Sequence, residues 1–272
     1  MEPRGLMGGF YRISEWIMRL AVINLLWIIC SLPFVFLVFS LVFVYPQGIT
    51  EEMLNESGVL PYLMWPIIVT SVVAPLTLFP ATAAMFTVAR KWVTGESDVA
   101  LFKTYFRGYK ENYKQSMIGG FIYTILIVLM VVNYFFYRDQ MAIASYIFLA
   151  FLALLFASLF NYFSMLVHYH MKTFQVIKNA ILITIGKPIR SLSTVMMCGI
   201  IIYISLFQLT FLIPFFMGSL VAFVAFWNFN LIYIKLQEQA DKLKQSEEEA
   251  AEEAAELNRE ELLKDNPNDS NK

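Results

Sequence analysis

Charged residues are scarce in this chain of 272 residues. Asp, Glu, Lys and Arg make up only 15% of it, whereas a soluble domain carries about 25%. Hydrophobic residues reach 58% and aromatic residues 16%, and the mean hydropathy is +0.61. This composition excludes an ordinary soluble enzyme, a disordered protein and a nucleic-acid-binding protein. It indicates a polytopic helical membrane protein.

Residues that form disulfides or hold metals are also rare. The two cysteines, Cys30 and Cys198, lie inside apolar runs and are interpreted as small packing residues. The two histidines, His168 and His170, would point about 200° apart on a helix, so they cannot share a metal ion. The chain contains no Walker, GxSxG or HExxH motif. We therefore expect no catalytic residue, no cofactor site, no metal site and no enzymatic activity.

Long uncharged stretches predict the membrane spans. About 20 apolar residues cross a bilayer core about 30 Å thick, and five stretches are at least this long. The last stretch, 191–234, would form a helix of about 66 Å, and Pro214 lies near its middle, so we divide it in two. The predicted fold is all-α with six transmembrane helices, at about 20–44, 62–89, 116–137, 141–167, 191–210 and 215–234.

The positions of the basic residues predict the orientation, since Lys and Arg concentrate in cytoplasmic segments. Nineteen of the twenty fall at the N-terminus, in the second and fourth loops or in the C-terminal tail, and Arg138 is the exception. The first loop, at about 45–61, carries three glutamates and no basic residue. We therefore expect both termini to be cytoplasmic.

Charge also divides the chain into two parts. Residues 1–235 are predicted to form the membrane domain, and residues 236–272 an acidic cytoplasmic tail. The tail is rich in Ala, Glu, Lys and Leu, which favour helix, so it is predicted to be helical and then disordered.

Two cytoplasmic segments, 99–114 and 174–190, have amphipathic helical periodicity. In the second, Gly186 and Pro188 are expected to end a helix whose apolar stripe is Phe174, Ile177, Ile181, Leu182 and Ile185. Such helices lie in the headgroup layer and attract anionic lipid, or they serve as docking surfaces for a cytoplasmic partner. The candidate interfacial or partner-docking residues are Phe102, Lys103, Phe106, Arg107, Tyr109, Lys110, Tyr113, Lys114, Lys178 and Asn179.

The predicted spans contain no Asp, Glu, Lys or Arg, which argues against a proton pump, an antiporter and a voltage sensor. Five amide side chains are the candidate intramembrane polar residues: Asn24, Asn133, Asn161, Gln208 and Asn228. Such amides join helices by hydrogen bonds, or they line a path for a polar substrate. Pro66, Pro75 and Pro80 bend the second span, either as static kinks or as a broken helix at a transport site.

Four short motifs are carried in order along the chain: Asn24-Leu25-Leu26-Trp27 through Ser31-Leu32-Pro33, then Pro80-Ala81-Thr82-Ala83-Ala84, then the segment 102–115, then Lys178-Asn179-Ala180 with Lys187-Pro188. Over about residues 5–235 the chain resembles the YesL family of bacterial integral membrane proteins of unknown function. The resemblance implies a multi-pass protein of the bacterial cell membrane and carries no catalytic residue with it.

Proteins of this family are often encoded beside carbohydrate-uptake ABC transporters. The resemblance therefore implies a non-enzymatic accessory or regulatory partner of a carbohydrate uptake system, with ABC-type sugar transporter components as partners beside the anionic headgroups of the bilayer. The alternative is a small-molecule permease or channel with a path near the proline-kinked second span.

Overall fold

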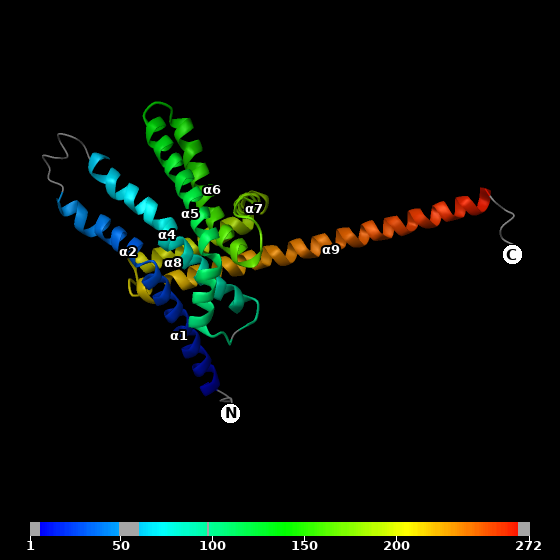
Figure 1. Ribbon diagram of the computed structural model, residues 1–272, viewed down its shortest axis with the longest axis horizontal. Coiled ribbons are helices and arrows are strands. Elements are labelled where there is room, and N and C mark those ends of the chain that lie inside the picture. The colour runs from blue at the N-terminus through cyan, green and yellow to red at the C-terminus, as the bar shows by residue number, and fades with distance from the viewer. Residues whose placement is uncertain (1–5, 49–59, 97, 266–272) are drawn as a thin grey trace. The chain divides into compact units, whose positions relative to one another are not determined.

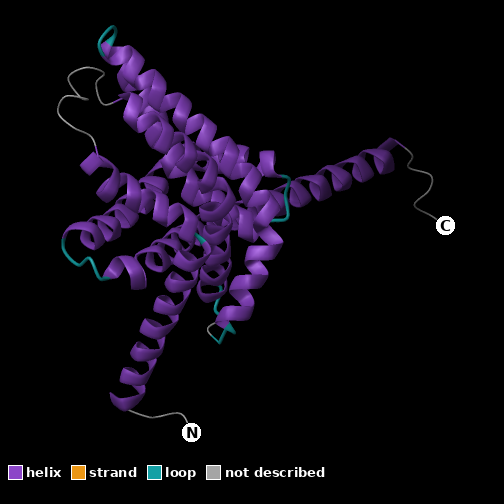
Figure 2. Cartoon of the chain, turned by 60° about the vertical axis from the view of Figure 1, so that its left-hand side comes forward, coloured by secondary structure: helices purple, strands orange, loops and turns teal. Residues whose placement is uncertain are grey.

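The computed structural model describes residues 6–48, 60–96 and 98–265, and the regular elements in these ranges are helices (Figures 1 and 2). Six helices are long and apolar enough to cross a membrane: Gly9–Cys30, Met64–Val93, Leu101–Arg138, Ala142–His168, Pro188–Phe207 and Ile213–Ala255. The predicted all-α fold with six helices of transmembrane length is confirmed. The chain divides into two compact units, Met1–Phe229 and Asn230–Lys272.

The first predicted span, 20–44, differs from the structure at both ends. Helix α1 (Leu6–Cys30) begins earlier, and it is followed after Ser31 by α2 (Leu32–Phe39), the π-helical turn η1 (Ser40–Val44) and the 3-10 turn η2 (Tyr45–Gly48). The helix breaks because Pro33, in the first turn of α2, has no amide hydrogen to continue the ladder of α1.

The early start of α1 brings charged residues into the first apolar helix. The predicted span at 20–44 excludes Glu15 and Arg19, whereas the membrane-length helix Gly9–Cys30 includes both. Their side chains form an ion pair one helical turn apart, and the Arg19 side chain is only 11% exposed. The expectation of charge-free spans therefore does not extend to the N-terminal half of α1.

Helices α4 (Leu60–Val93) and α5 (Leu101–Arg138) form an antiparallel hairpin (Figure 1). We predicted a surface helix at 99–114 and a separate span at 116–137, but α5 runs through both without a break. Its 38 residues rise about 57 Å, nearly twice the bilayer core. The amphipathic segment and the predicted span therefore form one continuous helix.

Small residues let α5 pack closely against its neighbours. The buried residues of α5 lie along one side of the helix and are Tyr105, Gly108, Ser116, Gly119, Gly120 and Tyr123. A Cβ atom added at Gly108 would lie 2.6 Å from the Thr87 hydroxyl, and one at Gly120 would lie 3.0 Å from the Cα of Pro75. Small residues at such positions let helix backbones approach closely in lipid.

The remaining helices are α6 (Ala142–His168), α7 (Thr173–Gly186), α8 (Pro188–Phe207), the π-helical turn η3 (Ile213–Met217) and α9 (Gly218–Asp265). Helix α7 ends at Gly186, as the sequence predicts, and Pro188 is the first residue of α8. The last apolar stretch divides at residues 208–212, which confirms the predicted turn. Helix α9 ends at Asp265, and the disorder predicted beyond it falls outside the described residues.

The core lies where α4, α6 and α9 approach one another. Its buried residues concentrate in three segments, Phe79–Trp92, Asn161–Val167 and Gly218–Phe229. The other halves of α4, α5 and α6 expose aliphatic and aromatic side chains. In a chain of this class lipid covers such surfaces, so their exposure is expected.

Candidate functional site

The first half of α5 carries the predicted basic and aromatic surface. Phe102 and Phe106 are 60% and 50% exposed. Four cations are exposed beside these rings: Lys103, Arg107, Lys110 and Lys114. Arg107 also pairs with Glu111 one turn later, at 2.8 Å between Nε and Oε1. We call Phe102, Lys103, Phe106, Arg107, Lys110 and Lys114 the α5 face.

Two tyrosines of the predicted surface turn toward the protein instead. Tyr109 and Tyr113 are half-buried, with ring centroids 5.6 Å apart. The Tyr113 hydroxyl donates to the carbonyl of Leu76 at 3.3 Å. This carbonyl stands four residues before Pro80, which has no amide hydrogen to offer it. Tyr113 thus satisfies a backbone group that a proline kink leaves open.

Helix α4 remains continuous across Pro66, Pro75 and Pro80. The Thr77 hydroxyl donates to the carbonyl of Val73 at 3.0 Å, which supplies a further hydrogen bond within the proline-rich segment. Together with the Tyr113 contact, this supports static kinks packed on neighbouring helices rather than a broken helix.

Sequence reasoning missed Tyr105, the best-buried aromatic residue in the first half of α5. Its side chain is 0% exposed, and its hydroxyl donates to the carbonyl of Ala81 at 3.1 Å. The Asn112 amide, two turns later, lies 3.4 Å from the Thr87 hydroxyl. The signal that could have found them is the recurrence of small and polar residues every three or four positions.

The second predicted surface, on α7, also has two faces. Val176, Ile177 and Ala180 are buried, whereas Phe174 and Leu182 of the predicted apolar stripe are exposed. Lys178 is exposed and Asn179 is half-buried, with its amide 3.6 Å from the Met171 sulfur.

Basic residues at the end of α4 hold the neighbouring loops. The Arg90 guanidinium donates to the carbonyl of Val167, near the C-terminus of α6, at 2.7 Å. Lys91 lies 2.7 Å from the Glu96 carboxylate, and its hydrogen bond and charge lower the pKa of Glu96. These contacts join the end of α4 to α6 and to the turn that follows α4.

Asn24 makes the hydrogen bonds expected of an amide that joins helices. Its side chain is fully buried and donates to the carbonyls of Ile213 and Pro214 at 2.9 and 2.7 Å. Its Oδ1 accepts from the amides of Gly218 and Ser219 at 2.8 and 3.1 Å. One side chain of α1 thus serves both ends of the π-helical turn η3.

The other four amides lie at separate places. Asn161 donates to the Thr184 hydroxyl at 2.9 Å and so joins α6 to α7. Asn133 donates to Leu129 of its own helix at 2.8 Å. Asn228 is buried with its amide 3.6 Å from the sulfur of Met197, and Gln208 is exposed at the end of α8. Their contacts favour helix packing over a shared polar path.

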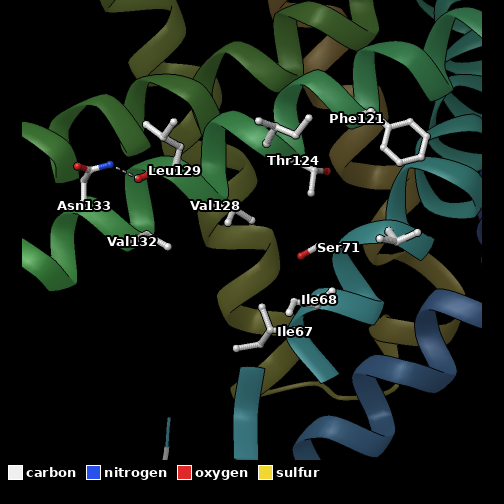
Figure 3. A pocket seen from close by; sticks show the side chains of 11 residues that line it. Ile67, Ile68, Ser71, Phe121, Thr124, Val128, Leu129, Val132 and Asn133 are labelled. Atoms are coloured by element: carbon white, nitrogen blue, oxygen red, sulfur yellow. Dashed lines mark hydrogen bonds between the residues drawn. The ribbon is translucent and has the colours of Figure 1, made fainter. Parts of the chain in front are cut away.

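Cavities between the helices of the first unit include two with apolar linings. A groove of about 450 Å³ between α4 and α5 is lined mainly by aliphatic side chains, with Ser71, Thr124 and Asn133 among them (Figure 3). A second cavity of about 310 Å³ lies beside Trp27 and Phe163, where the Trp27 indole donates to the Thr82 hydroxyl at 3.0 Å. Both linings suit apolar groups better than polar solutes.

His168 has aromatic surroundings. The His168 ring lies 4.8 Å from the Tyr169 ring and 5.9 Å from that of Phe229. Across residues 6–48, 60–96 and 98–265, no group of three or more His, Cys, Asp or Glu residues is placed to hold a metal ion.

These features define the class of the molecule: a multi-pass helical membrane protein whose intramembrane amides pack its helices. Comparison with known proteins places it more closely. Residues 20–134 match the family described as "Protein of unknown function, DUF624". No solved structure matches the chain significantly.

Three proteins from Bacillus subtilis (strain 168) are similar to this chain in sequence. Uncharacterized protein YteU is 27% identical over 226 residues, which cover 82% of this chain and 84% of YteU. Uncharacterized protein YesL is 28% identical over 221 residues, 79% of this chain and 85% of YesL. Uncharacterized protein YesV is 29% identical over 160 residues, 56% of this chain and 76% of YesV. Residues 20–134 are therefore similar to the DUF624 family, and the chain is similar over most of its length to the YesL-like proteins, which confirms the predicted resemblance.

Proposed function

We propose that this protein is a non-enzymatic accessory or regulatory partner of a carbohydrate uptake system, and that it contacts its partner through the α5 face. The observation that carries the proposal is the exposure of Phe102 and Phe106 beside four cations. The link to carbohydrate uptake rests on the family resemblance alone.

The first half of α5 has one buried side and one exposed side, which supports this assignment. Tyr105 and Gly108 are buried against α4, whereas Phe102 and Phe106 are directed away from it. Aromatic residues and arginine are enriched at protein interfaces, where a few residues carry most of the binding energy, and neighbouring charges steer association. Anionic headgroups attract the same cations, at about 1 kcal/mol for each basic residue near the surface.

The proposal requires the α5 face to be cytoplasmic, which the predicted orientation provides. We expect a membrane-impermeant maleimide to label Asp139→Cys in intact cells, and to label Lys110→Cys only after permeabilisation. The background for both is a variant without Cys30 and Cys198. The reverse labelling pattern would place the α5 face outside the cell and would contradict the proposal.

A comparison of two double variants tests the partner. We expect Phe102→Ala/Phe106→Ala to lower the recovery of ABC-type sugar transporter components several-fold in affinity purification from native membranes. The matched control, Phe135→Ala/Phe136→Ala, removes two rings that are 54% and 59% exposed near the other end of α5, and it should leave recovery unchanged. Isolation of the protein alone, in gentle detergents and with each inducing sugar, contradicts the proposal.

The alternative is a small-molecule permease or channel with a path along α4. Its support is the three prolines of this helix. Flux of oligosaccharides into liposomes that hold the purified protein would favour this alternative over the accessory role.

A further inference from the structure

We propose that the groove between α4 and α5 is a binding site for one acyl chain of a membrane phospholipid. The groove lies between the Ile67–Val72 segment of α4 and the Phe121–Asn133 segment of α5. This inference is independent of the proposed partner function, because the α5 face lies in the other half of that helix.

The groove has a structural cause. Close contact between Gly120 and the backbone of Pro75 brings the two helices together at one point. From there the helices diverge toward the N-terminus of α4 and the C-terminus of α5 (Figure 1). The side chains on the diverging faces leave a groove of about 450 Å³, within the range of ligand sites.

The lining identifies hydrocarbon as the occupant. Figure 3 shows aliphatic side chains from both helices around the groove, including Ile67, Val128 and Val132. These three are 46%, 39% and 60% exposed, on helices of transmembrane length, so acyl chains of the bilayer reach them directly. A polar solute would find few hydrogen-bonding partners there.

The surroundings of the groove favour an acyl chain over a polar ligand or a soluble partner. Its lining side chains lie on two helices of transmembrane length, so bilayer hydrocarbon is the apolar material next to them. A helix from a second copy of the chain is the other apolar occupant, and the experiments below distinguish it.

Two hydroxyl groups interrupt the apolar wall. Ser71 and Thr124 line the groove from opposite helices, and the Ser71 hydroxyl points into it in Figure 3. The Ser71 carbonyl lacks its usual helical donor, because Pro75, four residues later, has no amide hydrogen. An acyl chain that moves from the bilayer into the groove gains no hydrophobic free energy, because both surroundings are apolar. Its retention therefore depends on close packing with the groove wall.

Photolabelling of the full chain tests the site. The protein is reconstituted in vesicles of phosphatidylethanolamine and phosphatidylglycerol that contain a trace of phosphatidylglycerol with a diazirine in one acyl chain. We expect adducts on peptides 67–72 and 121–133 to exceed several-fold those around Ile200 and Leu206 of α8, which are exposed to the same lipid. Equal labelling of all exposed helices overturns the proposal.

Filling the groove provides the matched comparison. We expect Val128→Trp to lower labelling of peptide 67–72 several-fold, whereas Leu206→Trp, the control on α8, leaves it unchanged. Val132→Trp is a second filling variant at a more exposed position, in case the first does not fold. Unchanged labelling in a folded filling variant contradicts the site.

Other occupants give distinct results. Adducts from a photoreactive free fatty acid, without adducts from the phospholipid, overturn the phospholipid assignment. Disulfide-linked dimers through Val128→Cys in a variant without Cys30 and Cys198 place a second copy at the groove and likewise overturn it.

Discussion

Replacement of Asn24 with leucine is expected to lower the free energy of unfolding by about 2–4 kcal/mol. Four hydrogen bonds from this buried amide reach Ile213, Pro214, Gly218 and Ser219. Leucine leaves these backbone groups in an apolar setting without their side-chain partner. Individual interhelical hydrogen bonds in membranes contribute about 0.6–1.7 kcal/mol, so the loss of the set gives the larger figure.

The measurement is equilibrium unfolding of the purified protein in mixed micelles, followed by circular dichroism. Asn133→Leu is the matched control, because that amide donates only to Leu129 within its own helix in the described contacts. We expect its effect to stay below about 1 kcal/mol. Similar losses for the two variants would show that Asn24 has no special role at η3.

Replacement of Gly119 with alanine is expected to destabilise the protein by about 2–3 kcal/mol. The new Cβ would lie 2.5 Å from the Cζ atom of Tyr162. Tyr162 cannot easily move aside, because its hydroxyl donates to the carbonyl of Gln115 at 3.0 Å and its ring packs on Tyr123 and Phe163. The strain therefore falls on the contact between α5 and α6.

Gly199→Ala in α8 is the matched control, since nothing lies within 4 Å of a Cβ atom there. Alanine favours helix over glycine by up to about 1 kcal/mol, so this variant should be neutral or slightly more stable. Removal of the Tyr162 hydroxyl in Tyr162→Phe should reduce the cost of Gly119→Ala in a double-mutant cycle. Equal stability of the two glycine variants would rule out the steric contact.

The helices of transmembrane length could be predicted because lipid imposes a minimum apolar length on every span. Local signals also placed the end of α7 at Gly186 and the turn before Pro214. The break at Ser31 was missed because the apolar run continues through Pro33, and hydropathy does not register a lost amide hydrogen.

The candidate site was less predictable, for a different physical reason. Periodicity groups Phe102, Phe106 and Tyr113 on one stripe, but it cannot tell which edge of the stripe meets a neighbouring helix. In the structure the Tyr113 hydroxyl donates to the carbonyl of Leu76, and the hydroxyl of Tyr105, which the sequence did not single out, donates to the carbonyl of Ala81. Likewise, the sequence shows that Asn24 needs a partner and gives no sign that it lies 189 residues away.

That separation sets an order of assembly. The first helix enters the bilayer during synthesis with its amide exposed to hydrocarbon, and the groups that satisfy it are translated near the end of the membrane unit. A chain cut off before η3 therefore keeps an unsatisfied polar group at membrane depth, however well its earlier helices pack. Arrival of η3 and the start of α9 supplies the missing partners and completes the membrane unit.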